Sequence, residues 1–457
     1  MIIDELVSNV VRTKFEYFNL ETLEKAKNRL IDIIGCTIGG ANAPGCKELK
    51  SLVKEWGGKK QATILVHGGK IPAGNAAMIN TIMARSYDFG VLTPFIGEKA
   101  VWSHIEETTV PTAVTVAEWQ HSTGKQLLTA LILGDDLSTR ISAASAYMPG
   151  SSWDSPGIVN KFGAAAIAGK LMGLNERQIV NAMGIVLNQL AGSFQGINDG
   201  AISFKLAQGF SARDGIIAAE LAKKGWNAGK DPLLGKYGYF SLYCKISDLD
   251  YLTKDLGKKF YGDDIYKPYP SCRFTHSSID CALQMVHENE INSENIETIT
   301  LNLAPMHYGS TLDNPFELGE FPQCNANFSL RYQVANALYR KCVKLEHLTD
   351  PFIRDPGVGK LARKVNVVGN LSPEKIESAD LTVKMIDGKE FNIFVDVAKG
   401  HPLKKPLSKK EIEDKFRNNV DFSKTISKQN SEKVLKLINH IEEVDDITEI
   451  ICLMTIT

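Results

Sequence analysis

Hydrophobic residues recur at helical spacing over most of the first 265 positions. In residues 20–40, one helical face carries five apolar side chains: Leu23, Ala26, Leu30, Ile33 and Ile34. Comparable spacing predicts helices in six regions: 1–56, 75–90, 105–120 with a break before Pro111, 124–144, 162–193 with a helix cap at Asn175, and 211–226. A short strand is expected at 62–67. Since Ala and Gly are dense between 124 and 225, and period-two alternation is nearly absent there, we expect a tightly crossed, wholly helical body.

The pattern changes after about residue 265. Residues 296–305 and 379–400 alternate between apolar and polar side chains, as strands do, and Asp387-Gly388 between two alternating runs indicates a hairpin. Residues 327–343 between them have helical spacing. This segment is therefore predicted to be a second, α+β domain. The tail, 407–450, returns to charged amphipathic helices, which we expect to pack back on the first domain.

Composition excludes several classes of protein. Of the 457 residues 44% are hydrophobic, enough for large cores, and the net charge is −1. No basic field favours nucleic acid, and no apolar run is long enough to cross a membrane. The N-terminal stretch MIIDELVSNVV is acidic and amphipathic, unlike a signal peptide. We therefore expect a soluble, cytoplasmic protein that binds neither nucleic acid nor membrane.

Motifs for metals and nucleotide cofactors are missing from the sequence. The eight cysteines are scattered singly, without a C-x-x-C pair, which suits neither a zinc nor an iron–sulfur site. The glycine-rich stretches at 39–45 and 196–201 follow no predicted strand, so neither fits a phosphate-binding turn. We expect no cofactor and no metal, and hence acid–base chemistry by side chains alone.

One stretch combines groups that suit a carboxylate site. Residues 267–280, KPYPSCRFTHSSID, form a proline-stiffened lead-in to a helix, with Arg273 and His276 three residues apart at its start. A helix N-terminus with an Arg and a His would make an anion-binding corner with a titratable group. A tight turn with a solvated Arg and a packed His is about equally compatible with these residues.

Other candidate residues each have a structural and a functional interpretation. His104 precedes an acidic pair, and Asp88 lies at a predicted helix C-terminus, where an acid is electrostatically unfavourable. Tyr308 closes a predicted strand, where site residues are frequent. Asp154 is either a turn residue or a site acid. Lys205, between Phe204 and Leu206, is expected to bury its stem and direct its amine to a specific partner.

Taken together, these stretches resemble the MmgE/PrpD family over nearly the whole chain. The family pattern K-x-Y-P-x-C-R-x-T-H-x-x-I-D stands here as KPYPSCRFTHSSID, and further matches are FGAAAIAGKLMGL, LAQGFSARDGIIAAELAKKGW, LLGKYGYF, ANFSLRYQVANAL and VDVAKGHPLKKPLSKKEIEDKF. The resemblance implies a mainly α fold. A large all-helical domain is built from both chain ends (1–265 and 401–457), with a smaller α+β lid domain inserted at 266–400. It also implies a homodimer with the site in the cleft between domains.

The resemblance assigns roles to individual residues. It implies catalytic roles for four residues: His104, His276, Asp88 and Tyr308. Arg273 and Ser271 are assigned to substrate binding, together with Asp154 and Lys205. The chain also departs from the family pattern. Gly90-Val91 follow Asp88-Phe89 in place of two acids, Asp154-Ser155 replace a His-Pro pair, and Lys205 lies one place from the family lysine.

The function implied is a cofactor-independent lyase, a dehydratase or decarboxylase, acting on a small di- or tricarboxylate such as 2-methylcitrate or cis-aconitate. Arg273 would hold a carboxylate while His104 and His276 move protons, tuned by Asp88. Two alternatives stay open because of the departures. One is an epimerase of an iminodisuccinate-like dicarboxylate, and the other is a carboxylate-binding protein without turnover.

Overall fold

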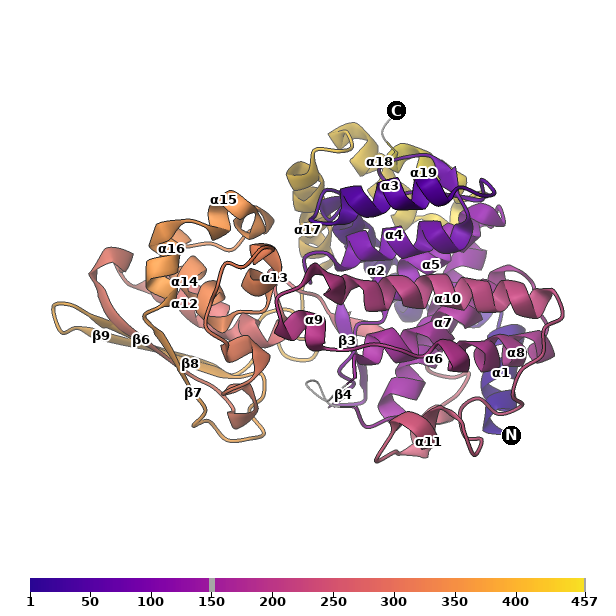
Figure 1. Ribbon diagram of the computed structural model, residues 1–457, viewed down its shortest axis with the longest axis horizontal. Helices are drawn as coiled ribbons and strands as arrows, with labels where there is room; N and C mark the ends of the chain where they lie inside the picture. Colours follow the sequence, from indigo (N-terminus) through magenta and orange to yellow (C-terminus); the bar gives the residue numbers. More distant parts are fainter. Residues whose placement is uncertain (148–152, 456–457) are drawn as a thin grey trace.

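The protein is predominantly helical. The computed structural model describes residues 1–147 and 153–455, and over these residues it contains 19 α-helices and nine short strands (Figure 1). Among the described helices, none is both long and apolar enough to cross a membrane. The helices of the first 265 residues are α1 (Ile2–Arg12), α2 (Leu20–Gly39), α3 (Cys46–Trp56), α4 (Ala73–Arg85), α5 (Glu106–Trp119), α6 (Gly124–Ala144), α7 (Ser155–Leu171), α8 (Glu176–Val186), α9 (Gln195–Asn198), α10 (Leu206–Lys223) and α11 (Tyr239–Tyr243).

Small residues let the central helices approach closely. Helix α7 packs against both α6 and α10. A Cβ added to Gly163 of α7 would meet Ser138 Oγ at 2.1 Å, and one added to Gly215 of α10 would meet Ala164 Cβ at 2.5 Å. The Ala- and Gly-rich pattern is thus explained by backbone contact between helices, as the sequence predicts.

The predicted helix cap at Asn175 and the packing of the tail are confirmed. The Asn175 side chain accepts the backbone N–H of Gln178 and caps α8. The tail contains α17 (Lys409–Ser423), α18 (Lys428–Asn439) and α19 (Thr448–Met454), and α17 packs on α2. There, Lys415 Nζ lies 2.7 Å from Asp32 Oδ1, and both residues are buried. Figure 1 shows both chain termini in the same helical part of the molecule.

The short strand expected at 62–67 is confirmed by β1 (Ala62–Thr63), which pairs with β2 (Lys70–Ile71). Two other expectations for the first 265 residues are wrong. The all-helical domain expected from the resemblance contains a further sheet of the order β4-β3-β5. Its strands are β3 (Leu92–Ile96), β4 (Lys99–Ala100) and β5 (Asp263–Ile265), and β3 and β5 pair across about 170 residues of sequence, a pairing that no local pattern encodes. Helix α5 also continues through Pro111 without a break. Proline removes one intrahelical hydrogen bond, and packing of α5 against α2, α4, α6, α7 and α10 maintains the helix.

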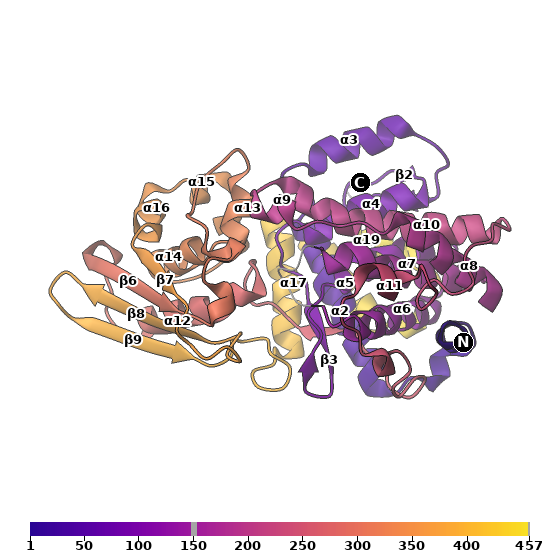
Figure 2. The ribbon, with the colours of Figure 1, turned by 60° about the horizontal axis from the view of Figure 1, so that its bottom comes forward.

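An α+β part follows β5. Its four-stranded sheet has the order β7-β6-β8-β9, with β7 parallel to β6 and the other pairs antiparallel. Helices α12 and α14 pack on this sheet, and Figure 2 shows the helices gathered over one of its faces. The predicted hairpin is confirmed, with Gly388 at φ 89° in its turn. The elements are α12 (His276–Glu288), β6 (Ile296–Asn302), α13 (Pro322–Asn327), α14 (Leu330–Arg340), α15 (Asp350–Ile353), α16 (Pro356–Ala362), β7 (Val365–Val368), β8 (Ala379–Met385) and β9 (Glu390–Val395).

The mainly α fold class is therefore confirmed. The division at 265/266 and 400/401 into a helical domain and a lid stays a prediction. It agrees with Figure 1, where α12 to α16 and β6 to β9 lie to one side of the remaining helices.

Candidate active site

Asp88 is a buried carboxylate held between two cations. It lies just beyond the end of α4, has φ 48°, and is only 1% exposed. Arg85, one helical turn earlier, forms an ion pair and hydrogen bond with its Oδ1. Lys267 Nζ lies 2.8 Å from the same oxygen and donates a second hydrogen bond, 2.7 Å long, to the Asp88 backbone carbonyl. A left-handed backbone at a non-glycine residue costs free energy and is common at functional sites.

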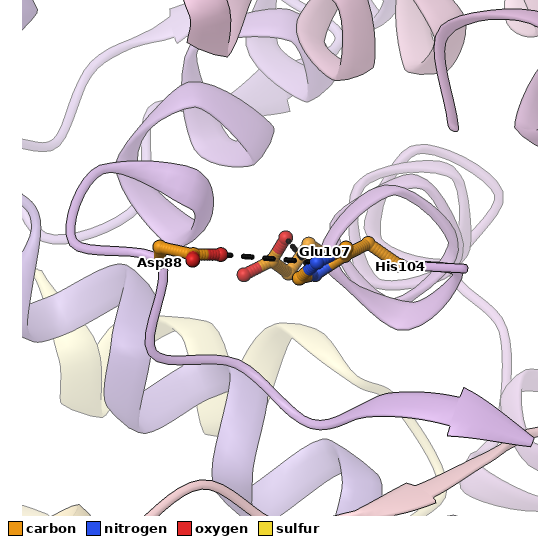
Figure 3. A group of neighbouring side chains, drawn as sticks. All are labelled: Asp88, His104 and Glu107. Carbon is orange, nitrogen blue, oxygen red and sulfur yellow. Dashed lines mark ion pairs between the residues drawn. The ribbon is translucent and has the colours of Figure 1, made fainter. Parts of the chain in front are cut away.

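His104 lies between two carboxylates. Its Nδ1 is 3.2 Å from Glu107 Oε2, and its Nε2 is 3.8 Å from Asp88 Oδ1 (Figure 3). Glu107 is fully buried in the first turn of α5, where Arg85 Nη1 approaches its Oε2 to 3.2 Å and Gln208 donates to the same oxygen. The negative charge of Glu107 favours a proton on Nδ1, although the contact does not have hydrogen-bond geometry. The distance of 3.8 Å to Asp88 is too long for a hydrogen bond, so Nε2 is left able to accept a proton.

Burial and charge set the protonation states of this cluster. Burial and the nearby Arg85 lower the pKa of His104, so its neutral form dominates at neutral pH. Burial alone would raise the pKa of Asp88, but Arg85, Lys267 and His104 outweigh it and lower that pKa. The pKa of Glu107 is lowered in the same way, chiefly by Arg85 against the effect of burial. The site thus combines a neutral imidazole with two stable carboxylates.

Asp263 fixes the backbone beside His104. Its Oδ2 accepts hydrogen bonds from the backbone N–H groups of Ile105, at 2.7 Å, and Glu106, at 3.3 Å, at the start of α5. Strand β5, which carries Asp263, pairs with β3, which follows Asp88. Burial and the neighbouring Glu106 raise the pKa of Asp263 well above its usual value.

Replacing Asp263 by Ala is expected to lower the free energy of unfolding by about 2 kcal/mol, the upper end of the cost of losing a cap, because the orphaned N–H groups are buried. Asp263→Asn is the matched control, since it is neutral and keeps an oxygen acceptor. Urea unfolding of both variants measures the difference. Equal stability of the two variants would show that the cap contributes nothing.

A cavity of about 190 Å³ opens beside this cluster. That is smaller than pockets for drug-sized ligands and suits a small molecule. Its lining is contributed by Arg85, Asp88, Leu92, Thr93, Trp102, Ser103, His104, Tyr147, Asp154, Pro156, Phe194, Ile197, Cys272, Arg273, Phe274, Met306, His307, Ser310, Thr311, Leu312 and Phe328. Segments of the helical part and of the α+β part therefore meet at one cavity. Burial raises the pKa of the Cys272 thiol to about 11, so this sulfur is not a thiolate nucleophile.

Asp154 faces the cavity from the N-terminus of α7. It is the N-cap residue, but its side chain makes no capping hydrogen bond. Burial raises its pKa to about 6, although the nearby Arg85 opposes the shift. The cavity therefore offers a carboxyl that is protonated in mildly acidic solution beside an imidazole that is neutral, the combination that acid–base catalysis needs.

Asp88, His104 and Glu107 could also be considered as metal ligands. One ligand atom from each lies within 4.8 Å of the others. However, Arg85 and Lys267 already lie against these carboxylates and supply compensating positive charge. The expectation of a site without a metal stays a prediction, and this charge balance favours it.

Two family models match the chain in succession. The MmgE/PrpD N-terminal domain matches residues 4–252, and the MmgE/PrpD C-terminal domain matches residues 269–441. The chain belongs to the MmgE/PrpD family. This confirms the family predicted from the motifs.

Several curated relatives of this MmgE/PrpD protein carry the name cis-aconitate decarboxylase. The human protein of that name is 24% identical over 444 residues, which cover 93% of this chain and 88% of the relative. A cis-aconitate decarboxylase of Aspergillus terreus is 23% identical over 426 residues, which cover 87% of this chain and 84% of the relative. The cis-aconitate decarboxylase-like protein oryM of Aspergillus oryzae is 22% identical over 477 residues, which cover 99% of this chain and 96% of the relative.

The cavity contains four of the eight residues assigned from the sequence. His104, Asp88, Asp154 and Arg273 line it. The Arg273 guanidinium, however, is already bound to Glu377 Oε1 at 3.0 Å and to the backbone carbonyls of Lys399 at 2.6 Å and Ala398 at 3.0 Å. Arg273 thus ties the start of α12 to the segment that returns to the helical part.

The other four assigned residues lie outside the lining. His276 is fully buried, with Nε2 3.3 Å from the Ser271 carbonyl and its ring edge-to-face with Tyr269. Ser271 is buried, with its hydroxyl 2.9 Å from Thr275 Oγ1. Lys205 has the predicted buried stem, and its amine donates to the Pro44 carbonyl at 2.9 Å. Tyr308 is 61% exposed. Their roles at the site stay predictions.

Three residues of the cluster were missed by sequence reasoning: Arg85, Glu107 and Lys267. Each lies in the sequence close to a residue or motif that the sequence analysis did identify. Lys267 opens the KPYPSCRFTHSSID stretch, Arg85 precedes Asp88 by three positions, and Glu107 follows His104 by three. Asp88 lies beyond the end of α4 and His104 before the start of α5, so helical spacing does not place these pairs, and only the fold shows that all of these groups face one another.

Proposed function

We propose that this protein is a cofactor-independent lyase that removes water or carbon dioxide from a small di- or tricarboxylate, of the kind of 2-methylcitrate or cis-aconitate. The observation that carries the proposal is the neutral His104 between Asp88 and Glu107 at the wall of a small cavity that also contains Arg85. Relatives named cis-aconitate decarboxylase support a lyase. A homodimer in the cytoplasm remains part of the proposal.

His104 is the proposed base. Nε2 takes the proton from the carbon next to a substrate carboxylate, and Asp88, at 3.8 Å, stabilises the imidazolium that forms. Arg85 is the proposed carboxylate anchor, because it is a cation that lines the cavity and whose Nη1 is held by Asp88 and Glu107. In a dehydration, the carbon–hydrogen bonding electrons then form the new double bond as the hydroxyl group leaves.

Asp154 is the proposed acid. In a dehydration, its proton goes to the departing hydroxyl group, which leaves as water. In a decarboxylation, the carbon–carbon bonding electrons remain on the substrate carbon, which takes a proton from the carboxyl while carbon dioxide leaves. Both steps use a protonated carboxyl that faces the cavity without a capping hydrogen bond.

The pH dependence of kcat/KM tests these two roles. His104 must be neutral, and its pKa is lowered, so the activity does not require alkaline solution. Asp154 must be protonated, and its pKa is about 6, so activity is expected to fall above that pH, about tenfold per unit. Asp154→Asn should remove this falling limb and lower kcat by about 10²-fold or more. A falling limb that persists in Asp154→Asn would assign it to another group.

An epimerase is the second candidate. The pairing of His104 with Asp154 at one cavity favours it, since epimerisation needs one group to remove a proton and another to return it. Deuterium incorporation at the α-carbon of iminodisuccinate, without elimination, would support the epimerase. Net loss of water or carbon dioxide from 2-methylcitrate or cis-aconitate would support the lyase.

A further inference from the structure

We propose that Asn160 is a positioning residue that sets the distance between the proposed base, His104, and the proposed acid, Asp154. The inference rests on the proposed function. It applies to the lyase and to the epimerase alike, since both need the two groups at a fixed separation. A hydrogen bond between the segment that carries His104 and the helix that carries Asp154 is the observation behind it.

Asn160 holds the peptide unit that follows His104. Its Nδ2 donates a hydrogen bond of 2.6 Å to the His104 carbonyl and one of 3.0 Å to Thr108 Oγ1 in the first turn of α5. The N–H of the same peptide unit, which belongs to Ile105, donates to Asp263 Oδ2. Because a peptide unit is planar, contacts at its carbonyl and at its N–H fix the direction in which the His104 side chain leaves the backbone.

Helix α7 connects this contact to Asp154. Asp154 is the N-cap residue of α7, and Asn160 lies six positions further along, about 9 Å along the helix axis. Residues 155–169 of α7 are buried, and the helix packs against α5, α6, α8 and α10. Close packing on so many sides makes α7 rigid. The hydrogen bond from Asn160 therefore fixes where Asp154 lies relative to His104.

Stability alone does not explain an asparagine at this position. Asparagine is a poor helix former, and burial of its amide costs free energy unless the amide is hydrogen-bonded. Asn160 is fully buried, and its Oδ1 has no hydrogen-bond partner in the part of the chain that the structure describes. The two contacts of Nδ2 thus account for the residue, and an apolar side chain would leave the His104 carbonyl unheld.

The kinetics of Asn160→Ala test the inference on the acid that the wild-type protein converts. We expect kcat to fall by about 10- to 100-fold, because proton transfer depends steeply on geometry. KM should be unchanged, because Asn160 is not among the described lining residues of the cavity. Circular dichroism checks that the variant is folded. An unchanged kcat in the folded variant would overturn the inference.

Asn80→Ala is the matched control for a purely structural effect. Asn80 is a fully buried asparagine of α4, and its Nδ2 also donates to a backbone carbonyl, that of Thr63 at 3.2 Å, and to a threonine hydroxyl, that of Thr115 at 3.3 Å. The control should lower the free energy of unfolding while kcat of the folded protein is retained. Equal losses of kcat in Asn80→Ala and Asn160→Ala would overturn the inference.

NMR tests the position of His104 without any reaction. The chain has nine histidines, so the ring signal of His104 in ¹⁵N-histidine-labelled protein is assigned by its loss in His104→Gln. In Asn160→Ala this signal should shift or broaden as the ring loses its single position. Thr108→Val removes only the second contact of the same amide and should leave the signal in place. An equal shift in both variants, or an unmoved signal in Asn160→Ala, would overturn the inference.

Two further outcomes are separable. If Asn160→Ala fails to fold, Asn160→Ser replaces it in both measurements, because its shorter hydroxyl does not reach the His104 carbonyl and the same losses are expected. If the wild-type protein converts none of the proposed acids but the His104 signal moves in the Asn160 variant alone, the proposed function fails while the positioning of His104 by Asn160 is supported.

Discussion

Replacing His104 by Gln is expected to lower kcat by about 10²- to 10⁴-fold, because the variant loses the proposed base while keeping a polar side chain of similar size. The fold should be retained, since the His104 side chain is 19% exposed and Asp263 holds the adjacent backbone from the other side. The measurement is kcat on the substrate that the wild-type protein converts, with circular dichroism as the check on folding.

His276→Gln is the matched comparison. The motif resemblance predicts a large loss of turnover for this variant as well, although His276 is buried outside the described cavity lining. His276 is held in its neutral form, because burial and the nearby Arg273 and Lys267 lower its pKa well below the usual value. A smaller loss of kcat in His104→Gln than in His276→Gln would contradict the assignment of the base to His104.

Replacing Asp88 by Ala is expected to destabilise the protein by about 3–5 kcal/mol, because it leaves the buried Lys267 and Arg85 without their shared carboxylate. The free energy of unfolding in urea measures this cost. Asp414→Ala is the matched control, since it removes a carboxylate at the surface of α17 that pairs with Lys410 at 3.2 Å and Arg417 at 3.1 Å. The control should change stability far less, because an ion pair exposed to solvent contributes little. Equal losses in the two variants would contradict the account of the buried cluster.

The effect of Asp88 also depends on pH. Its pKa is lowered in the folded protein, so its stabilisation is complete above the usual aspartate pKa, about 3.9. The stabilisation is lost as the pH falls below that value towards the lowered pKa. The stability difference between wild type and Asp88→Ala should therefore shrink in strongly acidic solution and stay constant around neutrality.

Local sequence signals predict the helices well because their causes are local. The periodicity of α2 and the cap at Asn175 can both be read from neighbouring residues, and both are confirmed. The sheet of β3, β4 and β5 could not be predicted in this way, because β3 and β5 are short and lie far apart in the sequence. The continuous helix through Pro111 is likewise a consequence of packing that surrounds α5.

The site could be predicted only in part, for a similar reason. The motif resemblance pointed to His104, Asp88 and Arg273, and all three line the cavity. It did not identify the ion pairs of Asp88 with Arg85 and Lys267, which join positions up to 179 residues apart. It also could not show that the Arg273 guanidinium is occupied by groups of its own part of the chain. The proposed catalytic chemistry is therefore assigned to the Asp88–His104 side of the cavity.

Proton exchange at the substrate carbon is the most direct test of the central claim. Cis-aconitate and 2-methylcitrate are incubated in deuterium oxide with wild-type protein or with His104→Gln, and followed by ¹H NMR. For the wild type, the account predicts either loss of carbon dioxide from cis-aconitate, with a deuterium added to the product, or loss of water from 2-methylcitrate, with exchange of the removed proton for deuterium. In the variant, the conversion is expected to be slower by about 10²-fold or more. Equal rates in the two proteins, or neither conversion nor exchange of either acid by the wild type, would contradict it.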